Sequence, residues 1–208
     1  MTHQAETLKQ SNLWANSTDL NTVRQQLLDL FCQLAYKEGD FVLSSGLPSS
    51  YYINGKEVTL HPQGALAIGR IVLSLLPLDT QAVAGLTLGA DPIVSAVSVV
   101  SAYENRPIPA LIIRKEAKGY GTKAYVEGPS LPEDTKVVVL EDTVTTGQSA
   151  MKAVQRLRDA GYTVNQVISL VDRQQGAAEF YQSVGLKFEA VFKISEIQKR
   201  YGELGSGE

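Results

Sequence analysis

Apolar residues near the start of the chain recur at helical spacing. Over Leu20–Leu34 they fall mostly three or four positions apart, so they share one face of a predicted helix. Ser17 or Thr18 is the residue type that caps such a helix. A second helix is predicted over Pro62–Leu75, because proline suits a first helical turn and Pro77 ends the pattern.

Two short extended segments are predicted between these helices. They lie at about Phe41–Leu43 and Tyr51–Ile53, where aromatic and β-branched residues cluster. Gly46 and Pro48 are residue types that form turns, and they stand between the two segments. The pattern therefore predicts a small extended unit ahead of the main fold.

From residue 82 onward, short apolar runs alternate with helical patterns. Continuous apolar strands separated by helices are typical of a parallel sheet covered on both faces. The sequence thus predicts an α/β fold with a doubly wound parallel sheet. The predicted strands are Ala82–Leu86, Ala110–Ile113, Val137–Leu140, Val167–Val171 and Phe188–Phe192. The predicted helices are Asp91–Tyr103, Gln148–Ala160 and Gln175–Val184.

One stretch interrupts the alternation. After Arg114 the chain is rich in lysine, glycine and polar residues to about Pro132. An irregular segment of this length in a compact domain is usually functional or disordered. We expect a mobile loop over about 114–128.

Composition narrows the class of protein. The 208 residues are 44% hydrophobic and 20% charged, which suits one soluble domain with its own core. A net charge of −3 gives no basic excess for general nucleic-acid binding. Cys32 is the only cysteine, which favours a reducing compartment. No apolar run approaches the roughly 18 residues that cross a bilayer.

The first residues, Met1–Asn16, are polar and lack the layout of a signal peptide. We therefore expect a flexible leader over 1–16, a single domain over 17–208 and a cytoplasmic location. No nucleic-acid or membrane partner is expected.

The most informative segment is a strand, a turn and a helix. The apolar run Val137–Leu140 ends in Glu141 and Asp142, and a hydroxyl-rich turn with one glycine follows over Thr143–Ser149. Ligands of open α/β sheets bind at the carboxyl ends of strands. Free N–H groups at a helix N-terminus favour an anion, and Gly147 lets the backbone approach it closely. The predicted ligand is a phosphate monoester.

Glu141 and Asp142 would repel a phosphate that they faced. They suit neutral ribose hydroxyls or a cation as partners, or they are strand-end acids that cap the following helix. A P-loop is excluded, because the Gly-Lys-Ser/Thr ending is absent, and Gly119 and Gly121 do not complete a dinucleotide-binding motif.

This segment resembles the phosphoribosyl pyrophosphate (PRPP) motif of type I phosphoribosyltransferases. The resemblance implies that Glu141 and Asp142 hold the ribose hydroxyls and that the turn wraps the 5′-phosphate. The turn residues so implied are Thr143, Val144, Thr145, Thr146, Gly147, Gln148 and Ser149. The motif leaves the base open among adenine, hypoxanthine, uracil and orotate.

Three further segments resemble orotate phosphoribosyltransferases. Phe41–Gly46 with Ser50–Asn54 resembles their N-terminal hood, which implies that Tyr52 and Ile53 contact orotate. Without that resemblance, the segment is a half-buried hairpin with tyrosines on one face. The hood so implied spans about 20–60 and the core about 62–195.

The basic run Arg114–Gly121 resembles the mobile loop of that family. It implies that Arg114, Lys115 and Lys118 bind pyrophosphate, that the loop reaches across a homodimer, and that Lys118 is tied most closely to catalysis. An exposed charge run is otherwise usually solvated surface.

Arg173, after the strand Val167–Val171, resembles the arginine that reads orotate, and Thr145 is a further expected orotate contact. The local alternative for Arg173 is a surface ion pair with Asp172 or Glu179. Gly85–Ile93 resembles the loop on the pyrophosphate side of the site.

The chain departs from the family at three places. Ser44 stands where many members have lysine, Leu88-Gly89 where many have Tyr-Lys, and Tyr120 where histidine is usual. These differences remove two cations and an imidazole, so we assign no phosphate binding to those positions.

The implied reaction transfers ribose 5-phosphate from PRPP to orotate, giving orotidine 5′-monophosphate and pyrophosphate in pyrimidine biosynthesis. Mg²⁺ is the expected cofactor, bound mainly through PRPP rather than by a protein metal site. The alternatives are a purine or uracil phosphoribosyltransferase, or a regulator that senses PRPP.

Overall fold

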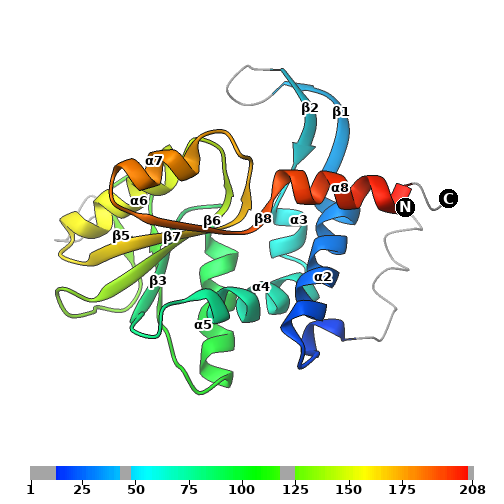
Figure 1. The fold of residues 1–208 in the computed structure, drawn as a ribbon. Helices are drawn as coiled ribbons and strands as arrows, with labels where there is room; N and C mark the ends of the chain where they lie inside the picture. The colour runs from blue at the N-terminus through cyan, green and yellow to red at the C-terminus, as the bar shows by residue number, and fades with distance from the viewer. Residues whose placement is uncertain (1–12, 43–47, 118–124, 206–208) are drawn as a thin grey trace.

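A six-stranded sheet forms the centre of the molecule (Figure 1). The computed structural model describes residues 13–42, 48–117 and 125–205, and the structural statements below refer to these ranges. The strand order is β5-β4-β3-β6-β7-β8, and only β5 runs antiparallel to its neighbour. The strands are β3 (Ala82–Leu86), β4 (Ala110–Ile113), β5 (Val126–Glu127), β6 (Lys136–Val144), β7 (Thr163–Asp172) and β8 (Lys187–Lys193).

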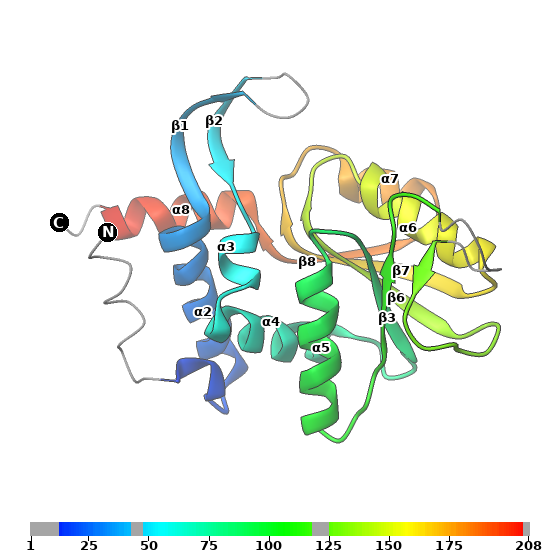
Figure 2. The same ribbon diagram turned by 180° about the vertical axis from the view of Figure 1, so that it is seen from behind.

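Helices cover both faces of this sheet, as the alternating pattern predicted. On one side lie α4 and α5, and on the other α6 and α7 (Figures 1 and 2). The doubly wound α/β prediction is therefore confirmed. The bounds are α4 (Pro62–Leu75), α5 (Asp91–Tyr103), α6 (Gln148–Asp159) and α7 (Ala177–Ser183).

Strand β6 is longer than predicted. The sequence pattern ended it at Leu140, because the residues that follow are polar. The ladder with β7 continues instead through the pairs Glu141↔Ser169 and Val144↔Asp172. Glu141 and Asp142 therefore lie within the last part of strand β6. The side-chain pattern could not predict this, because the strand is extended by backbone pairing.

The segment predicted as a loop over 114–128 also contains a strand. Val126–Glu127 pairs antiparallel with Ile112 and Ile113 at the end of β4, and it forms the edge of the sheet. The polar neighbours of this two-residue strand hide it from a periodicity argument. The middle of the segment, 118–124, lies outside the described residues.

The two extended segments predicted ahead of the main fold form an antiparallel pair of strands, β1 and β2, which we call the hood. Helix α2 continues directly into a π-helical turn. Both strands begin earlier in the sequence than predicted. The C-terminal helix α8 packs against α2 and this turn (Figure 1). The elements are α2 (Leu20–Leu30), the turn Phe31–Ala35, β1 (Tyr36–Val42), β2 (Pro48–Ile53), α3 (Lys56–Thr59) and α8 (Ile194–Gly205).

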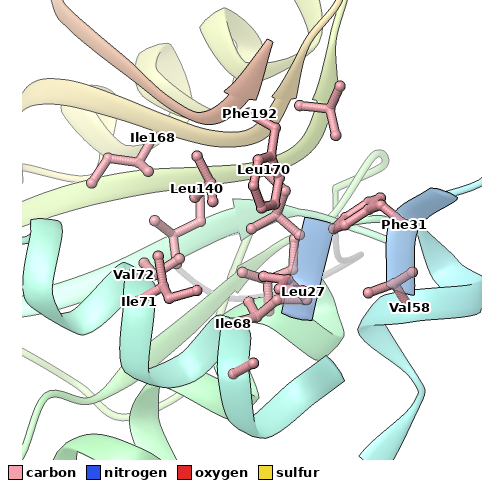
Figure 3. Packing of buried hydrophobic residues seen from close by; sticks show 14 of the residues in the cluster. Leu27, Phe31, Val58, Ile68, Ile71, Val72, Leu140, Ile168, Leu170 and Phe192 are labelled. Carbon is pink, nitrogen blue, oxygen red and sulfur yellow. The ribbon is translucent and has the colours of Figure 1, made fainter. Parts of the chain in front are cut away.

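One apolar cluster joins the hood to the sheet (Figure 3). Leu27 and Phe31 pack on Ile68 of α4 and on the sheet residues Leu170 and Phe192, and all are less than 2% exposed. The rings of Phe31 and Phe192 meet edge to face, with centroids 5.6 Å apart. Burial at roughly 25 cal/mol per Å² of apolar surface makes this cluster a main source of stability.

The start of the described chain corrects two predictions. Helix α2 is capped by Asp19, not Ser17 or Thr18, because the Asp19 carboxylate accepts hydrogen bonds from the N–H groups of Asn21 and Thr22. The predicted leader also ended too late. Residues Trp14–Asn16 form a 3-10 turn with Ala15 fully buried, and Arg70 donates to the Ala15 carbonyl oxygen at 2.6 Å.

Replacing this cap tests its role in stability. Asp19→Ala leaves two helix N–H groups without an acceptor, so we expect the melting temperature to fall by about 2–4 °C. Thr18→Ala is the matched control and leaves it unchanged. Thermal unfolding followed by circular dichroism measures both variants, and equal melting temperatures would contradict the assignment.

Candidate active site

The carboxyl ends of β3 and β6 meet at the point where the strand order reverses. The chain passes from β3 to β4 on one side and returns to β6 on the other. Loops leaving two such strands diverge to opposite faces of the sheet, and the crevice between them is the usual ligand site of open α/β folds. The acids predicted from the sequence lie at this edge.

The turn from β6 to α6 provides a cradle for an anion. Gly147 has φ +86°, and a Cβ there would lie 2.9 Å from the rings of Phe180 and Tyr181, so no other residue fits without strain. The Tyr181 hydroxyl donates to the Gly147 carbonyl oxygen at 3.1 Å. No side chain caps α6, so its first N–H groups are available to a ligand.

A cavity of about 80 Å³ opens above this turn. A single water needs roughly 10–15 Å³ by the same measure, so the space accepts a group of several heavy atoms. Every residue predicted to wrap the phosphate lines it, which brings the predicted turn set together. The lining is Glu141, Thr143, Val144, Thr145, Thr146, Gly147, Gln148, Ser149, Ala150 and Tyr181.

Glu141 is a buried acid with an unused oxygen. Its side chain is 7% exposed, and Oε2 has no hydrogen-bond partner among the described residues. Burial, and then the charge of the adjacent Asp142, raises the pKa of Glu141 to about 8. Neither acid caps α6, so the helix-capping alternative is wrong. Oε2 is therefore free to accept a hydrogen bond from a hydroxyl group of a ligand.

Asp142 sits between the two loops of the crevice. Its Oδ1 accepts a hydrogen bond from the Thr143 N–H at 2.8 Å. A Cβ on Gly89 would lie 2.7 Å from Asp142 Oδ2, so the β3 loop passes directly over this carboxylate. The lack of a side chain at Gly89 therefore has a steric reason. The adjacent Thr87–Leu88 peptide bond is cis.

The start of the basic loop lies near the acids. The charge of Lys115 acts on Glu141 and lowers its pKa, against the larger effect of burial. Arg114 is held by Glu127 at 3.0 Å, so its guanidinium has a partner within the chain. Lys118 and Tyr120 lie outside the described residues.

Arg156 on α6 anchors the base of this loop, and sequence reasoning missed it. Its guanidinium donates to the carbonyl oxygens of Arg114 and, at 2.9 Å, of Lys115. The same group lies over the Tyr125 ring, 4.2 Å from the centroid. An arginine on an amphipathic helix carries no sequence signal for such a role, because its partners are backbone atoms.

Arg173 lies at the end of β7 and faces the hood. Its Nε donates to the Tyr51 hydroxyl at 3.0 Å, while Nη2 is buried without a partner among the described residues. The described ion pairs include none between Arg173 and Asp172 or Glu179; Asp172 instead accepts from the Gln174 N–H at 2.8 Å. The surface ion-pair alternative for Arg173 is therefore wrong.

The hood tyrosines point to opposite faces. Tyr51 is 9% exposed and meets Arg173, whereas Tyr52 is 44% exposed and its ring lies 5.6 Å from that of Phe41. Ile53 is half-buried against the core. The sequence named Tyr52 and Ile53 but not Tyr51, because adjacent aromatic residues in a strand do not reveal which one turns inward. Ser44 lies outside the described residues.

A larger cavity, of about 410 Å³, lies at the opposite end of the strands from the crevice. Lys136, Thr163 and Lys187, the first residues of three strands, contribute to its lining. It contains none of the predicted residues and is not part of the crevice. The described residues hold no group of three or more His, Cys, Asp or Glu side chains placed to bind a metal. No described helix is both long and apolar enough to span a membrane.

Comparison with known sequences identifies close relatives. The family model described as uracil phosphoribosyltransferase matches residues 94–192. An orotate phosphoribosyltransferase of Nostoc sp. is 80% identical over 206 residues, which cover 99% of this chain and 100% of that protein. One from Synechocystis sp. is 71% identical over 182 residues, which cover 88% and 92%.

Comparison with solved structures gives similar neighbours. Orotate phosphoribosyltransferase of Mycobacterium tuberculosis H37Rv, in complex with Fe(III) dicitrate, matches with a TM-score of 0.76 at 38% identity. The match covers 84% of this chain and 98% of that one. The same enzyme in complex with PRPP has a TM-score of 0.71 at 35% identity, over 85% and 99%.

The raised pKa of Glu141 predicts a pH-dependent stability. Folding moves this pKa from about 4.5 to about 8, so the folded chain holds a proton that the unfolded chain has lost between these values. The stabilisation is full below about pH 4.5 and is lost as pH rises through 8. Glu141→Gln imitates the protonated form at every pH.

We therefore expect Glu141→Gln to melt close to wild type at about pH 5 and at least about 2 °C higher at about pH 9. Differential scanning calorimetry at both values measures this. Exposed Glu104, changed to Gln, is the control and shifts both temperatures equally. A wild-type-to-variant gap that is the same at both pH values would contradict the prediction.

Proposed function

Because this chain belongs to the orotate phosphoribosyltransferase family, we propose which of its residues bind and convert the two substrates. The reaction transfers ribose 5-phosphate from PRPP to orotate and yields orotidine 5′-monophosphate and pyrophosphate. This proposal rests mainly on the cavity at the β6–α6 turn, which is lined by the hydroxyl-rich turn and by Glu141, with Asp142 next to it in sequence. The product is a pyrimidine nucleotide, so the enzyme serves pyrimidine biosynthesis.

PRPP is proposed to bind with its 5′-phosphate in the cavity lined by Thr143–Ser149. The N–H groups at the start of α6 and the hydroxyl groups of the turn are the donors for its oxygens. The ribose hydroxyls donate to Glu141 and Asp142. Glu141 Oε2, buried without a partner, supports this pairing, because a hydroxyl supplies the missing hydrogen bond.

Orotate is proposed to lie between the hood and Arg173, with Tyr52, Ile53 and Thr145 as further contacts. Orotate differs from uracil by a carboxylate, so one placed cation is what discrimination requires. Arg173 supports this role, because its buried Nη2 is a donor without an acceptor in the described protein. A guanidinium pairs well with a carboxylate.

The chemical step is displacement at ribose C1, in which an orotate nitrogen forms the new bond as pyrophosphate leaves. Negative charge grows on the pyrophosphate and positive character on the ribose. Arg114, Lys115 and Lys118 are proposed to stabilise the leaving group electrostatically. To bind pyrophosphate, Arg114 must break its ion pair with Glu127. If the ion pair persists, Arg114 only stabilises the loop. No side-chain nucleophile is required.

Mg²⁺ is the proposed cofactor. The Asp142 carboxylate together with the substrate's own oxygens fits a cation that uses one or two protein carboxylates. When bound, it neutralises charge on the pyrophosphate. The residues of this chain bind the ribose, orient the two substrates and, through the loop, exclude water from C1.

We further propose a cytoplasmic homodimer with a loop shared across the interface. The free, buried thiol of Cys32 fits a reducing compartment. Val99 and Tyr103, which are 59% and 84% exposed on α5, offer apolar surface to a second copy. A leader that ends before Trp14, ahead of one domain with a hood over about 20–60 and a core over about 62–195, stays a prediction.

A base-competition assay tests the choice of orotate. We expect product from orotate and none from uracil or adenine, even though the matching family model is named for uracil. Arg173→Ala raises KM for orotate at least about tenfold and leaves KM for PRPP within twofold. Robust product from uracil or adenine, with none from orotate, would contradict the proposal that orotate is the substrate base. Tight nucleic-acid binding without turnover would favour a PRPP-sensing regulator.

Lys118→Ala tests the role of the loop. Losing a cation that acts on the leaving group lowers kcat by about a hundredfold or more, with a much smaller change in either KM. Steady-state orotate consumption measures both constants, and Lys152→Ala, a lysine on the outer side of α6, is the control. Unchanged turnover would remove Lys118 from this role.

Mixing two inactive variants tests the shared loop. A dimer of one Lys118→Ala chain and one Asp142→Asn chain contains one intact site if the loop crosses to the partner. It contains none if each loop serves its own chain. Activity should therefore return on mixing, and its absence in a demonstrated mixed dimer would place the loop on its own site.

A further inference from the structure

Tyr51 is a buried hood residue to which the roles above assign no task. Its hydroxyl accepts the hydrogen bond from Arg173 Nε at 3.0 Å, and the guanidinium carbon lies 4.8 Å from the centre of its ring. The two residues come from strands more than a hundred positions apart in sequence, β2 and the end of β7. Among the described residues, Tyr51 therefore links the hood to Arg173.

An aromatic stack supports Tyr51 from behind. Its ring stacks on that of Tyr36 in β1, with centroids 5.8 Å apart and an angle of 25° between the planes. Tyr36 in turn meets Tyr201 of α8 edge to face at 4.9 Å. Tyr36 and Tyr51 are 3% and 9% exposed, so the stack is packed and Tyr51 has little freedom to move.

The residue after Arg173 is tied to the same helix. Gln174 has φ +56°, and its Oε1 accepts a hydrogen bond from the Ser195 N–H at the start of α8, at 3.3 Å. The Arg173 N–H itself donates to the Val144 carbonyl oxygen at 2.9 Å. The backbone of Arg173 is thus fixed from the sheet and α8, and its side chain is fixed by Tyr51.

This arrangement determines which edge of the guanidinium remains for a ligand. Because Nε donates to Tyr51, the terminal nitrogens are left to pair with a carboxylate, and Nη2 has no other partner. A free arginine side chain loses rotamer entropy when it binds a ligand, whereas a fixed one has already lost it before the ligand arrives. Preorganisation of this kind increases affinity for the carboxylate without taking part in the chemical step.

We propose that Tyr51 is a positioning residue for orotate: its hydroxyl, held by the Tyr36–Tyr201 stack, orients Arg173 toward the substrate carboxylate. The inference rests on the proposed role of Arg173. It makes the hood and α8 determinants of base selection, in addition to their part in the core.

Tyr51→Phe removes the hydroxyl and keeps the ring in its stack. We expect KM for orotate to rise about tenfold, the effect of losing a hydrogen bond to a charged group. The turnover number and KM for PRPP stay within twofold, because neither depends on Arg173. The melting temperature, measured alongside, reports any general loosening of the hood.

Tyr36→Phe is the matched control. It also removes a hydroxyl from a buried ring of the stack, but that hydroxyl donates to Glu38, at 3.2 Å, and not to Arg173. We expect KM for orotate to stay at the wild-type value in this variant. An equal rise in both variants, or a rise in both KM values with Tyr51→Phe, would make Tyr51 a scaffold residue and overturn the proposal.

Arg173→Ala distinguishes the proposed role of Arg173 in binding orotate from the proposed role of Tyr51 in positioning Arg173. If it raises KM for orotate while Tyr51→Phe does not, the positioning role fails and the role of Arg173 stands. If Arg173→Ala leaves KM for orotate unchanged, both fail. In the double variant, Tyr51→Phe adds no further loss to Arg173→Ala, and an additive loss would show that Tyr51 acts on orotate by another route.

Discussion

Parallel pairing of β3 with β6 is the constraint on which the site depends. The register that sets Gly85 opposite Leu140 brings the β3 loop over Asp142 and leaves space for no side chain at Gly89. Because the flanking helices lie on opposite faces, the two loops separate and leave the crevice open. A shift of this register by one residue would move the side chains of Glu141 and Asp142 each to the other face of the sheet.

The same pairing explains the electrostatics of the site. Extending the β6–β7 ladder through Val144 keeps Glu141 in the sheet, where burial and Asp142 raise its pKa to about 8. A protonated acid at this position adds no charge beside the β6–α6 turn. An anionic ligand at this turn therefore meets less negative charge from the protein.

Much of this could be read from the sequence, for identifiable reasons. Helix α4, helix α5 and strands β3 and β4 have their predicted bounds, because prolines and short apolar runs mark their ends. The turn Thr143–Ser149 could be singled out because its residues are contiguous in sequence. Tyr51 and Arg156 were missed because they act through partners distant in sequence or through backbone oxygens. Asp19 was missed as a cap because Ser17 and Thr18 offered equally good chemistry nearby.

The packing of α8 on the first helix has a consequence for synthesis on the ribosome. Ion pairs join Arg24 to Glu196 and Asp29 to Arg200, each at 2.7 Å, so the end of the chain completes a unit begun near its start. The β6–α6 turn and its contact with Tyr181 need only residues up to α7, whereas the stack behind Tyr51 needs Tyr201. A growing chain can therefore form the β6–α6 turn first, and the stack behind Tyr51 forms only after α8 has emerged.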